Sequence, residues 1–221
     1  MKSIEKTFVT AMVSAAIVIW TNWVEASPNW KIPLEGGYSY NVNVQYGGLA
    51  YDNSIDVYHT DSRNGYYAID FNKPVNLLEP KVLAAAAGTV IQIYDNPSTG
   101  YGYGVKLDHG NGYQSVYGHF KAKPSVVLNQ SVLQGQVLGV MGSTGISSGT
   151  HLHFATYFDG HCLSTVPESK PEPLSGYIDI RVNQPLTSDN YLVGSYSDGF
   201  HTDGTFQAFI NAFNPHYPEI G

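Results

Sequence analysis

The sequence predicts a mainly β fold, with a compact antiparallel sheet or sandwich at the centre of one domain. Residues 38–46 alternate aromatic or apolar residues with Ser, Asn and Gln, as a strand with one buried face does. Glycine (23 residues) and tyrosine (17 residues) are abundant, and this composition favours strands joined by tight turns. A chain of 221 residues is long enough for one globular domain with additional segments.

The first 26 residues are typical of a secretory signal peptide. A basic start precedes a mostly apolar run at residues 8–24, and the residues ending at Ala26 offer a cleavage position. We expect the mature chain to begin near Ser27, and the protein to be secreted, periplasmic or associated with the cell wall. The alternative is an uncleaved membrane anchor, although the apolar run is short for a membrane-spanning helix.

Charge and cysteine content argue against two classes of protein. The formal net charge is -7 and no cluster of Lys and Arg is present, which is unlike a nucleic-acid-binding protein. The single cysteine, Cys162, excludes an internal disulfide and a cysteine-based zinc cluster. We expect Cys162 to be buried.

The middle of the chain is predicted to form short strands separated by glycines. Residues 82–94 contain two strands that meet at Gly88, and residues 103–120 form a hairpin whose turn includes His109. We interpret His109 as a local hydrogen-bonding residue. Residues 132–145 contain four glycines, and they fit short strands better than a helix, because an interior glycine costs a helix ~1 kcal/mol.

Asp70 stands out in the short strand at residues 67–71, because it lies between Ile69 and Phe71. A carboxylate in an apolar strand is costly to bury unless it is paired, protonated or bound to a cation. A structural hydrogen-bonding role and a metal-binding role are both open at this point.

His151 and His153 lie two residues apart in a strand, so their side chains point to the same face. Their Cα atoms are expected to be roughly 6.5–7 Å apart, from two strand steps of ~3.3 Å. Both imidazoles can therefore serve one centre, one as a metal ligand and one as a proton carrier or hydrogen-bond donor. The alternative is two histidines on a solvated strand face.

The last part of the chain differs in composition, because six of the twelve prolines fall within residues 165–221. We expect residues 164–221 to form a peripheral C-terminal extension packed on the same domain. Strands are possible at residues 177–182 and 191–195.

Three residues spread along the chain offer the ligand set that zinc prefers. His59, Asp70 and His153 provide two nitrogens and one carboxylate oxygen, which leaves a coordination position for water. His119 and His151 are two further imidazoles that can transfer protons or donate to an oxyanion.

Several motifs between residues 50 and 160 occur in the order found in the M23 zinc metallopeptidases, the lysostaphin-like or LytM-type cell-wall endopeptidases, which this stretch closely resembles. The motifs are Ala85-Ala86-Ala87-Gly88-Thr89-Val90, Tyr101-Gly102-Tyr103-Gly104-Val105-Lys106-Leu107-Asp108-His109-Gly110-Asn111-Gly112-Tyr113, Tyr117-Gly118-His119-Phe120, Gly135-Gln136-Val137-Leu138-Gly139, Gly142-Ser143-Thr144-Gly145 and Gly149-Thr150-His151-Leu152-His153-Phe154.

The resemblance implies a peptidase domain over residues 27–163 that binds one zinc ion in a groove. It implies that His59, Asp70 and His153 bind the metal, and that His119 and His151 assist the attack of water and stabilise the tetrahedral intermediate. The implied function is that of a secreted zinc endopeptidase acting on stem or cross-bridge peptides of peptidoglycan. We expect the protein to be a monomer.

The sequence departs from the common family pattern at two places. Many members separate the first His and the Asp by four positions, whereas His59 and Asp70 are eleven apart, as in the β-lytic and staphylolysin branch. The Glu that often follows the His-x-His-Phe motif is Ala155 here.

The alternative function is that of a degenerate, non-catalytic relative that binds the cell wall or activates another hydrolase. A cupin-like metal protein and a β-sandwich adhesion module explain fewer of the motifs.

Overall fold

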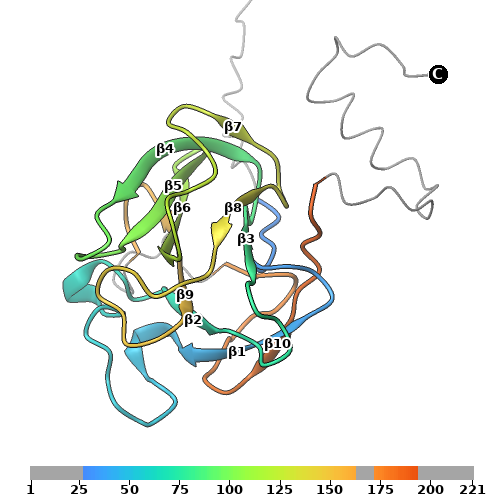
Figure 1. Cartoon of the computed structure of the whole chain (residues 1–221). Coiled ribbons are helices and arrows are strands. Elements are labelled where there is room, and N and C mark those ends of the chain that lie inside the picture. Colours follow the sequence, from blue (N-terminus) through green and yellow to red (C-terminus); the bar gives the residue numbers. More distant parts are fainter. Residues whose placement is uncertain (1–26, 163–171, 194–221) are drawn as a thin grey trace, which may run out of the picture.

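The computed structural model describes residues 27–162 and 172–193, so the predicted signal peptide and much of the predicted C-terminal extension lie outside the described residues. Figure 1 shows two sheets, one large and one small. The strands are β1 (Ser39–Val44), β2 (Ile69–Asn72), β3 (Lys81–Leu83), β4 (Gly88–Asp95), β5 (Tyr103–Gly110), β6 (Tyr113–Phe120), β7 (Ser131–Val132), β8 (Val137–Val140), β9 (His151–Phe158) and β10 (Pro185–Thr187). Two short 3-10 turns, η1 (Tyr46–Gly48) and η2 (Asp61–Arg63), are the helical elements of the described residues.

The large sheet has eight strands in the order β10-β1-β2-β9-β6-β5-β4-β7, and the small sheet pairs β3 with β8. Every pairing between these strands is antiparallel. The prediction of a mainly β, antiparallel fold is confirmed. The predicted strand at residues 38–46 corresponds to β1, in which Tyr40, Val42 and Val44 are buried as the alternation requires.

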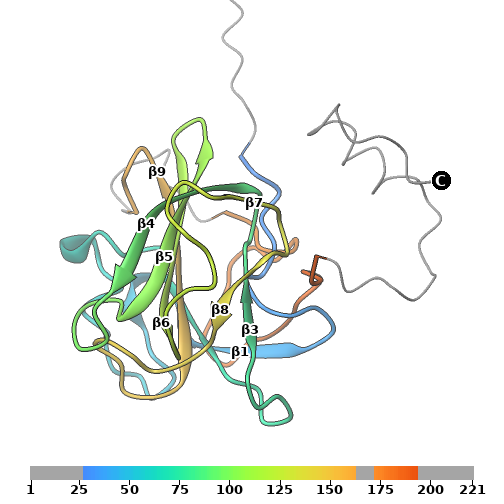
Figure 2. The same cartoon turned by 45° about the horizontal axis from the view of Figure 1, so that its top comes forward.

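The core lies between the large sheet and the small one. Figure 2 shows β3 and β8 side by side, next to the large sheet. Val82 and Leu138 of the small sheet belong to one cluster of buried side chains with Leu152 and Phe154 of β9. Because alternate residues of a strand point to opposite faces, this packing turns His151 and His153 away from the core.

The strand register places the candidate site residues beside one another. In the β2–β9 pair Asp70 lies opposite His153, and in the β6–β9 pair Gly118 lies opposite His153. Directly opposite residues of an antiparallel pair have Cβ atoms ~4.5–5.5 Å apart on the same face. The pairing of three central strands therefore brings Asp70, His153 and the end of β6 together.

The strands suggested at residues 177–182 and 191–195 are not formed by the described part of those segments. Backbone φ angles are positive at Ser175, Asp179 and Asn183, so the chain turns repeatedly where an extended strand was expected. The strand of this region is β10, which pairs with β1 at the edge of the large sheet.

Cys162 is a free, fully buried cysteine, as expected. Burial raises the pKa of its thiol to about 12, so the thiol is protonated and inert at neutral pH. Within the described ranges, none of the helical segments has the length and apolar character needed to cross a membrane.

Candidate metal centre

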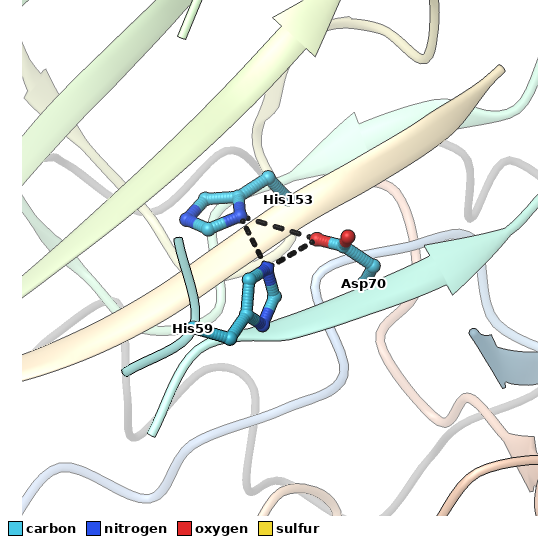
Figure 3. A group of neighbouring side chains, drawn as sticks. All are labelled: His59, Asp70 and His153. Atoms are coloured by element: carbon cyan, nitrogen blue, oxygen red, sulfur yellow. Dashed lines mark hydrogen bonds and ion pairs between the residues drawn. The ribbon is translucent and has the colours of Figure 1, made fainter. Parts of the chain in front are cut away.

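Three side chains from separate parts of the chain converge at the centre of the large sheet (Figure 3). Asp70 projects from β2 and His153 from the neighbouring β9, while His59 comes from the loop between η1 and η2. Their exposed fractions are 1% for His59, 4% for Asp70 and 6% for His153. The structure thus brings together the three residues that the sequence offers as metal ligands.

The three ligand atoms form a nearly equilateral triangle. His153 Nδ1 lies 3.2 Å from His59 Nε2 and 3.1 Å from Asp70 Oδ1, and His59 Nε2 lies 3.2 Å from Asp70 Oδ1. Around a tetrahedral zinc with ligand bonds of ~2.0–2.1 Å, neighbouring ligand atoms are roughly 3.3–3.4 Å apart. The triangle therefore has the size of one face of a zinc coordination tetrahedron.

Hydrogen atoms alone do not satisfy this triangle while Asp70 is ionised. If both ring nitrogens carry hydrogen, the two hydrogens face each other between His59 and His153. If one or neither does, a nitrogen lone pair faces the carboxylate or the other lone pair. A cation that receives all three lone pairs removes the conflict, so the donor set fits a metal ion better than a hydrogen-bonded network.

Asp70 is ionised because of its two histidine neighbours. Burial alone raises the pKa of this carboxyl, but His59 and His153 outweigh it and hold the pKa well below its usual range. The effects on the histidines are opposite in sign. Burial lowers the pKa of His153, whereas for His59 the attraction of Asp70 exceeds the effect of burial and raises the pKa.

The main chain fixes the orientation of the His59 ring. His59 Nδ1 lies 3.0 Å from the carbonyl oxygen of Ala68, and because a carbonyl only accepts, Nδ1 carries the hydrogen. This contact leaves Nε2 to face Asp70 and His153. The Ala68 carbonyl thus has the place of the outer hydrogen-bond partner that orients a metal-binding histidine. Gly65 permits the loop to close here, because a Cβ at this position would lie 2.2 Å from the carbonyl oxygen of Tyr58.

His119 and His151 lie beside the triangle, with their ring centroids 4.6 Å apart. Each ring is held by a main-chain carbonyl: His119 Nδ1 lies 2.7 Å from Thr144 O, and His151 Nδ1 lies 2.8 Å from Gly149 O. Nδ1 therefore donates in both rings, and in the neutral state Nε2 of each ring is an acceptor. His151 Nε2 also lies 3.6 Å from Asp70 Oδ2.

Burial, together with the nearby His153 and His151, lowers the pKa of His119 to about 3. The ring is accordingly neutral at neutral pH, with one hydrogen on Nδ1 and a lone pair on Nε2. The Nε2 lone pair can accept a hydrogen bond from a nearby water, whereas the lowered pKa makes the ring a weaker base than a free imidazole.

All five of these residues line one pocket of about 780 Å³. One wall is formed by residues of the loop 50–58, including Tyr51 and Tyr58, and another by residues 146–148. A pocket of this size accommodates a segment of peptide next to the candidate metal centre.

The structure adds one residue that sequence reasoning did not select. The ring of Tyr101 lies 5.2 Å from that of His153, its hydroxyl lies 3.3 Å from that of Tyr157, and it also lines the pocket. With 17 tyrosines in the chain, composition gave no sign that this one contacts His153.

Residues 64–164 match the family model described as Peptidase family M23. The match includes four of the five site residues and begins five residues after His59.

Two curated relatives illustrate the similarity. The chain is 35% identical over 92 residues to the DD-carboxypeptidase/endopeptidase Mpg of Neisseria meningitidis, covering 42% of this chain and 20% of the relative. It is 29% identical over 168 residues to the Murein hydrolase activator NlpD of Salmonella dublin, covering 72% of this chain and 38% of the relative. The chain thus spans about a fifth of the length of the first of these relatives.

Among solved structures, a putative peptidase M23 from Pseudomonas aeruginosa is 27% identical, with a TM-score of 0.45, over 62% of this chain and 49% of that one. On its match over residues 64–164 and its curated relatives, the chain carries a domain of peptidase family M23.

Proposed function

We propose that this protein is a secreted, zinc-dependent endopeptidase that hydrolyses peptide bonds in bacterial peptidoglycan, in its stem or cross-bridge peptides. The observation that carries the proposal is the triangle of His59, Asp70 and His153, with ligand atoms 3.1–3.2 Å apart, at a pocket that also holds His119 and His151. The apolar, signal-like residues 1–26 support action outside the cytoplasm, where peptidoglycan lies.

In this proposal His59, Asp70 and His153 hold one zinc ion. When bound, zinc supplies Lewis-acid chemistry, because it polarises a carbonyl and lowers the pKa of water towards ~7. The fold holds the three ligand side chains rigidly. Asp70 and His153 lie opposite each other on paired strands, and the Ala68 carbonyl orients the ring of His59.

His119 and His151 act as proton acceptors. Both rings donate Nδ1–H to a main-chain carbonyl, so each presents the Nε2 lone pair when neutral. The ring that takes the proton from water gains an Nε2–H, and only then can it donate to a developing oxyanion or to the leaving amine. One histidine thus first accepts the proton and then donates it, and the other histidine supports it.

The relatives support the substrate class. A DD-carboxypeptidase/endopeptidase is among the proteins that are similar to this chain, and its name denotes hydrolysis of peptide bonds.

The second candidate is a non-catalytic activator of another hydrolase, and the alignment with a Murein hydrolase activator favours it. A protein that acts only by binding has no need for three metal-ligand side chains at 3.1–3.2 Å and two further buried histidines. We therefore rank the endopeptidase first.

Digestion of purified muropeptides, followed by mass spectrometry, distinguishes the two candidates. The endopeptidase cleaves cross-linked muropeptides alone, loses this activity with a chelator and regains it when zinc is added back. An activator leaves muropeptides intact in every condition but accelerates a separately added hydrolase. The latter result would overturn the proposal.

A further inference from the structure

We propose that Thr144 is a positioning residue for His119: its carbonyl oxygen fixes the ring, and its hydroxyl holds the strand bulge that directs the ring into the pocket. This inference rests on the proposed role of His119 as a proton acceptor. Thr144 is neither one of the three candidate metal ligands nor one of the two histidines beside them.

His119 occupies a bulge at the end of β6. Tyr103 pairs with Phe120 and Val105 pairs with Tyr117, so one residue of β5 faces two residues of β6, Gly118 and His119. The φ angle of His119 is 63°, a left-handed conformation that costs a non-glycine residue free energy. Bulges bend a strand and redirect a side chain, and here the redirected side chain is that of His119.

The hydroxyl of Thr144 bonds to the strand pair that closes this bulge. It donates to the carbonyl of Phe120 at 2.7 Å and accepts the backbone N–H of Tyr103 at 2.9 Å. Tyr103 and Phe120 are partners in the β5–β6 register. One hydroxyl therefore ties both strands together on the far side of the extra residue.

The carbonyl of the same residue accepts Nδ1–H of His119 at 2.7 Å. The backbone N–H of His119 donates to the carbonyl of Tyr101 at 2.7 Å. His119 is thus held at its main chain and at its ring by two neighbouring segments. Surrounding contacts of this kind allow a strained φ angle to persist.

Those two segments are locked against each other by their backbones. Gly145 N–H donates to Pro97 O at 2.7 Å and Ile146 N–H donates to Gly100 O at 2.9 Å. A Cβ on Gly102, whose φ is 67°, would lie 2.4 Å from Thr144. This close approach leaves Thr144 little freedom to move, so the position of its carbonyl is set by the fold.

The test compares Thr144→Val, which keeps the shape but removes the hydroxyl, with Thr144→Ser, which restores it. Thr150→Val, at an exposed threonine of the same segment, is the matched control. For muropeptide cleavage we expect Thr144→Val to lower kcat about tenfold or more with KM within about twofold, as loss of an outer supporting contact does. Thr144→Ser and Thr150→Val should stay near the parent protein.

A second readout does not depend on cleavage. Ring ¹⁵N chemical shifts of His119 report which nitrogen carries the hydrogen, and zinc content reports the metal centre. We expect the parent protein and Thr144→Ser to show the hydrogen on Nδ1, and Thr144→Val to show a shift towards a mixture, with zinc content unchanged.

The outcomes separate this inference from the proposed function. If the parent protein cleaves nothing but the His119 shifts respond to Thr144→Val as expected, the endopeptidase proposal fails and the positioning role stands. If Thr144→Val leaves the His119 shifts and kcat unchanged, or if Thr144→Ser does not restore them, the positioning role is overturned.

Discussion

Two histidine clusters in this protein differ in whether hydrogen atoms can satisfy them. In the first, His109 lies 2.8 Å from the carbonyl of Ala87 through Nδ1 and 2.6 Å from the hydroxyl of Ser115 through Nε2. Ser115 in turn lies 2.9 Å from the hydroxyl of Tyr117, which accepts the N–H of Ala85 at 2.9 Å. The second cluster is the triangle of His59, Asp70 and His153.

In the His109 cluster every contact can pair a hydrogen with a lone pair, because each hydroxyl can donate or accept. The contacts run in a line and end on main-chain groups, so the cluster is complete without a ligand. In the triangle the contacts close on themselves among three acceptor atoms, and no arrangement of ring hydrogens suits an ionised Asp70. A short distance between histidines therefore does not by itself indicate a metal site. A group of acceptor atoms that hydrogen-bond donors cannot satisfy does indicate one.

Removing one histidine from each cluster gives the largest contrast. We expect His153→Ala to lose bound zinc and to lower peptidase activity by ~10³-fold or more, since a metal contributes several kcal/mol at 1.36 kcal/mol per tenfold. His109→Ala should keep its zinc. Metal analysis of the purified, folded variants measures this, and equal zinc loss in both would remove the distinction.

Next in size is the loss of a proton acceptor beside the triangle. His151→Ala is expected to lower kcat by ~10²–10⁴-fold, the usual contribution of general acid–base catalysis, because its Nε2 no longer accepts a proton. Zinc content should stay at one per chain. Steady-state cleavage rates and metal analysis test this together; loss of zinc in His151→Ala would make it a ligand instead.

A smaller effect, on the free energy of unfolding, is expected when the hydrogen bonds of the His109 cluster are broken. Ser115 is fully buried, and Ser115→Ala leaves Nε2 of His109 without its hydrogen-bond partner. An unsatisfied buried polar group costs ~1–3 kcal/mol, so denaturant unfolding should show a loss of this size. Zinc content should not change. An unaltered free energy of unfolding would mean that the hydrogen bond to Ser115 contributes nothing net.

The smallest expected effect is the pH dependence of stability that His109 confers. Burial lowers the pKa of His109 in the folded protein below that of the unfolded chain, ~6.5. Below that pH the unfolded state binds more protons, so the stability that neutral His109 supports is lost as the pH falls through the interval between the two pKa values.

We therefore expect the zinc-saturated parent protein to lose stability on acidification from about pH 6.5, by at most ~1.4 kcal/mol per pH unit from this group. In His109→Gln, which has no titrating ring, the slope should be shallower over the same interval. Unfolding curves measured at several pH values test the difference, and identical slopes in the two proteins would contradict it.

Much of the fold was predictable because burial on one face leaves a period of two in a strand. The alternation at residues 38–46 predicted β1, and the pair His151 and His153 was placed on one face of β9. The expected strands at residues 177–182 were wrong, because Asp179 and Asn183 adopt turn conformations that apolar alternation does not reveal.

The sequence by itself determined the kinds of side chain available: two imidazoles and one carboxylate with zinc-like preferences, and two more imidazoles beside them. Only the tertiary structure decided which of the eight histidines meet. His59 is eleven residues from Asp70 and 94 from His153. Antiparallel pairing of β2 with β9 brings Asp70 beside His153, and the loop between η1 and η2 brings His59 Nε2 within 3.2 Å of both of their ligand atoms. The tertiary structure also decided which ring nitrogen carries hydrogen, because the carbonyls of Ala68, Thr144 and Gly149 come from main-chain positions whose side chains do not specify them.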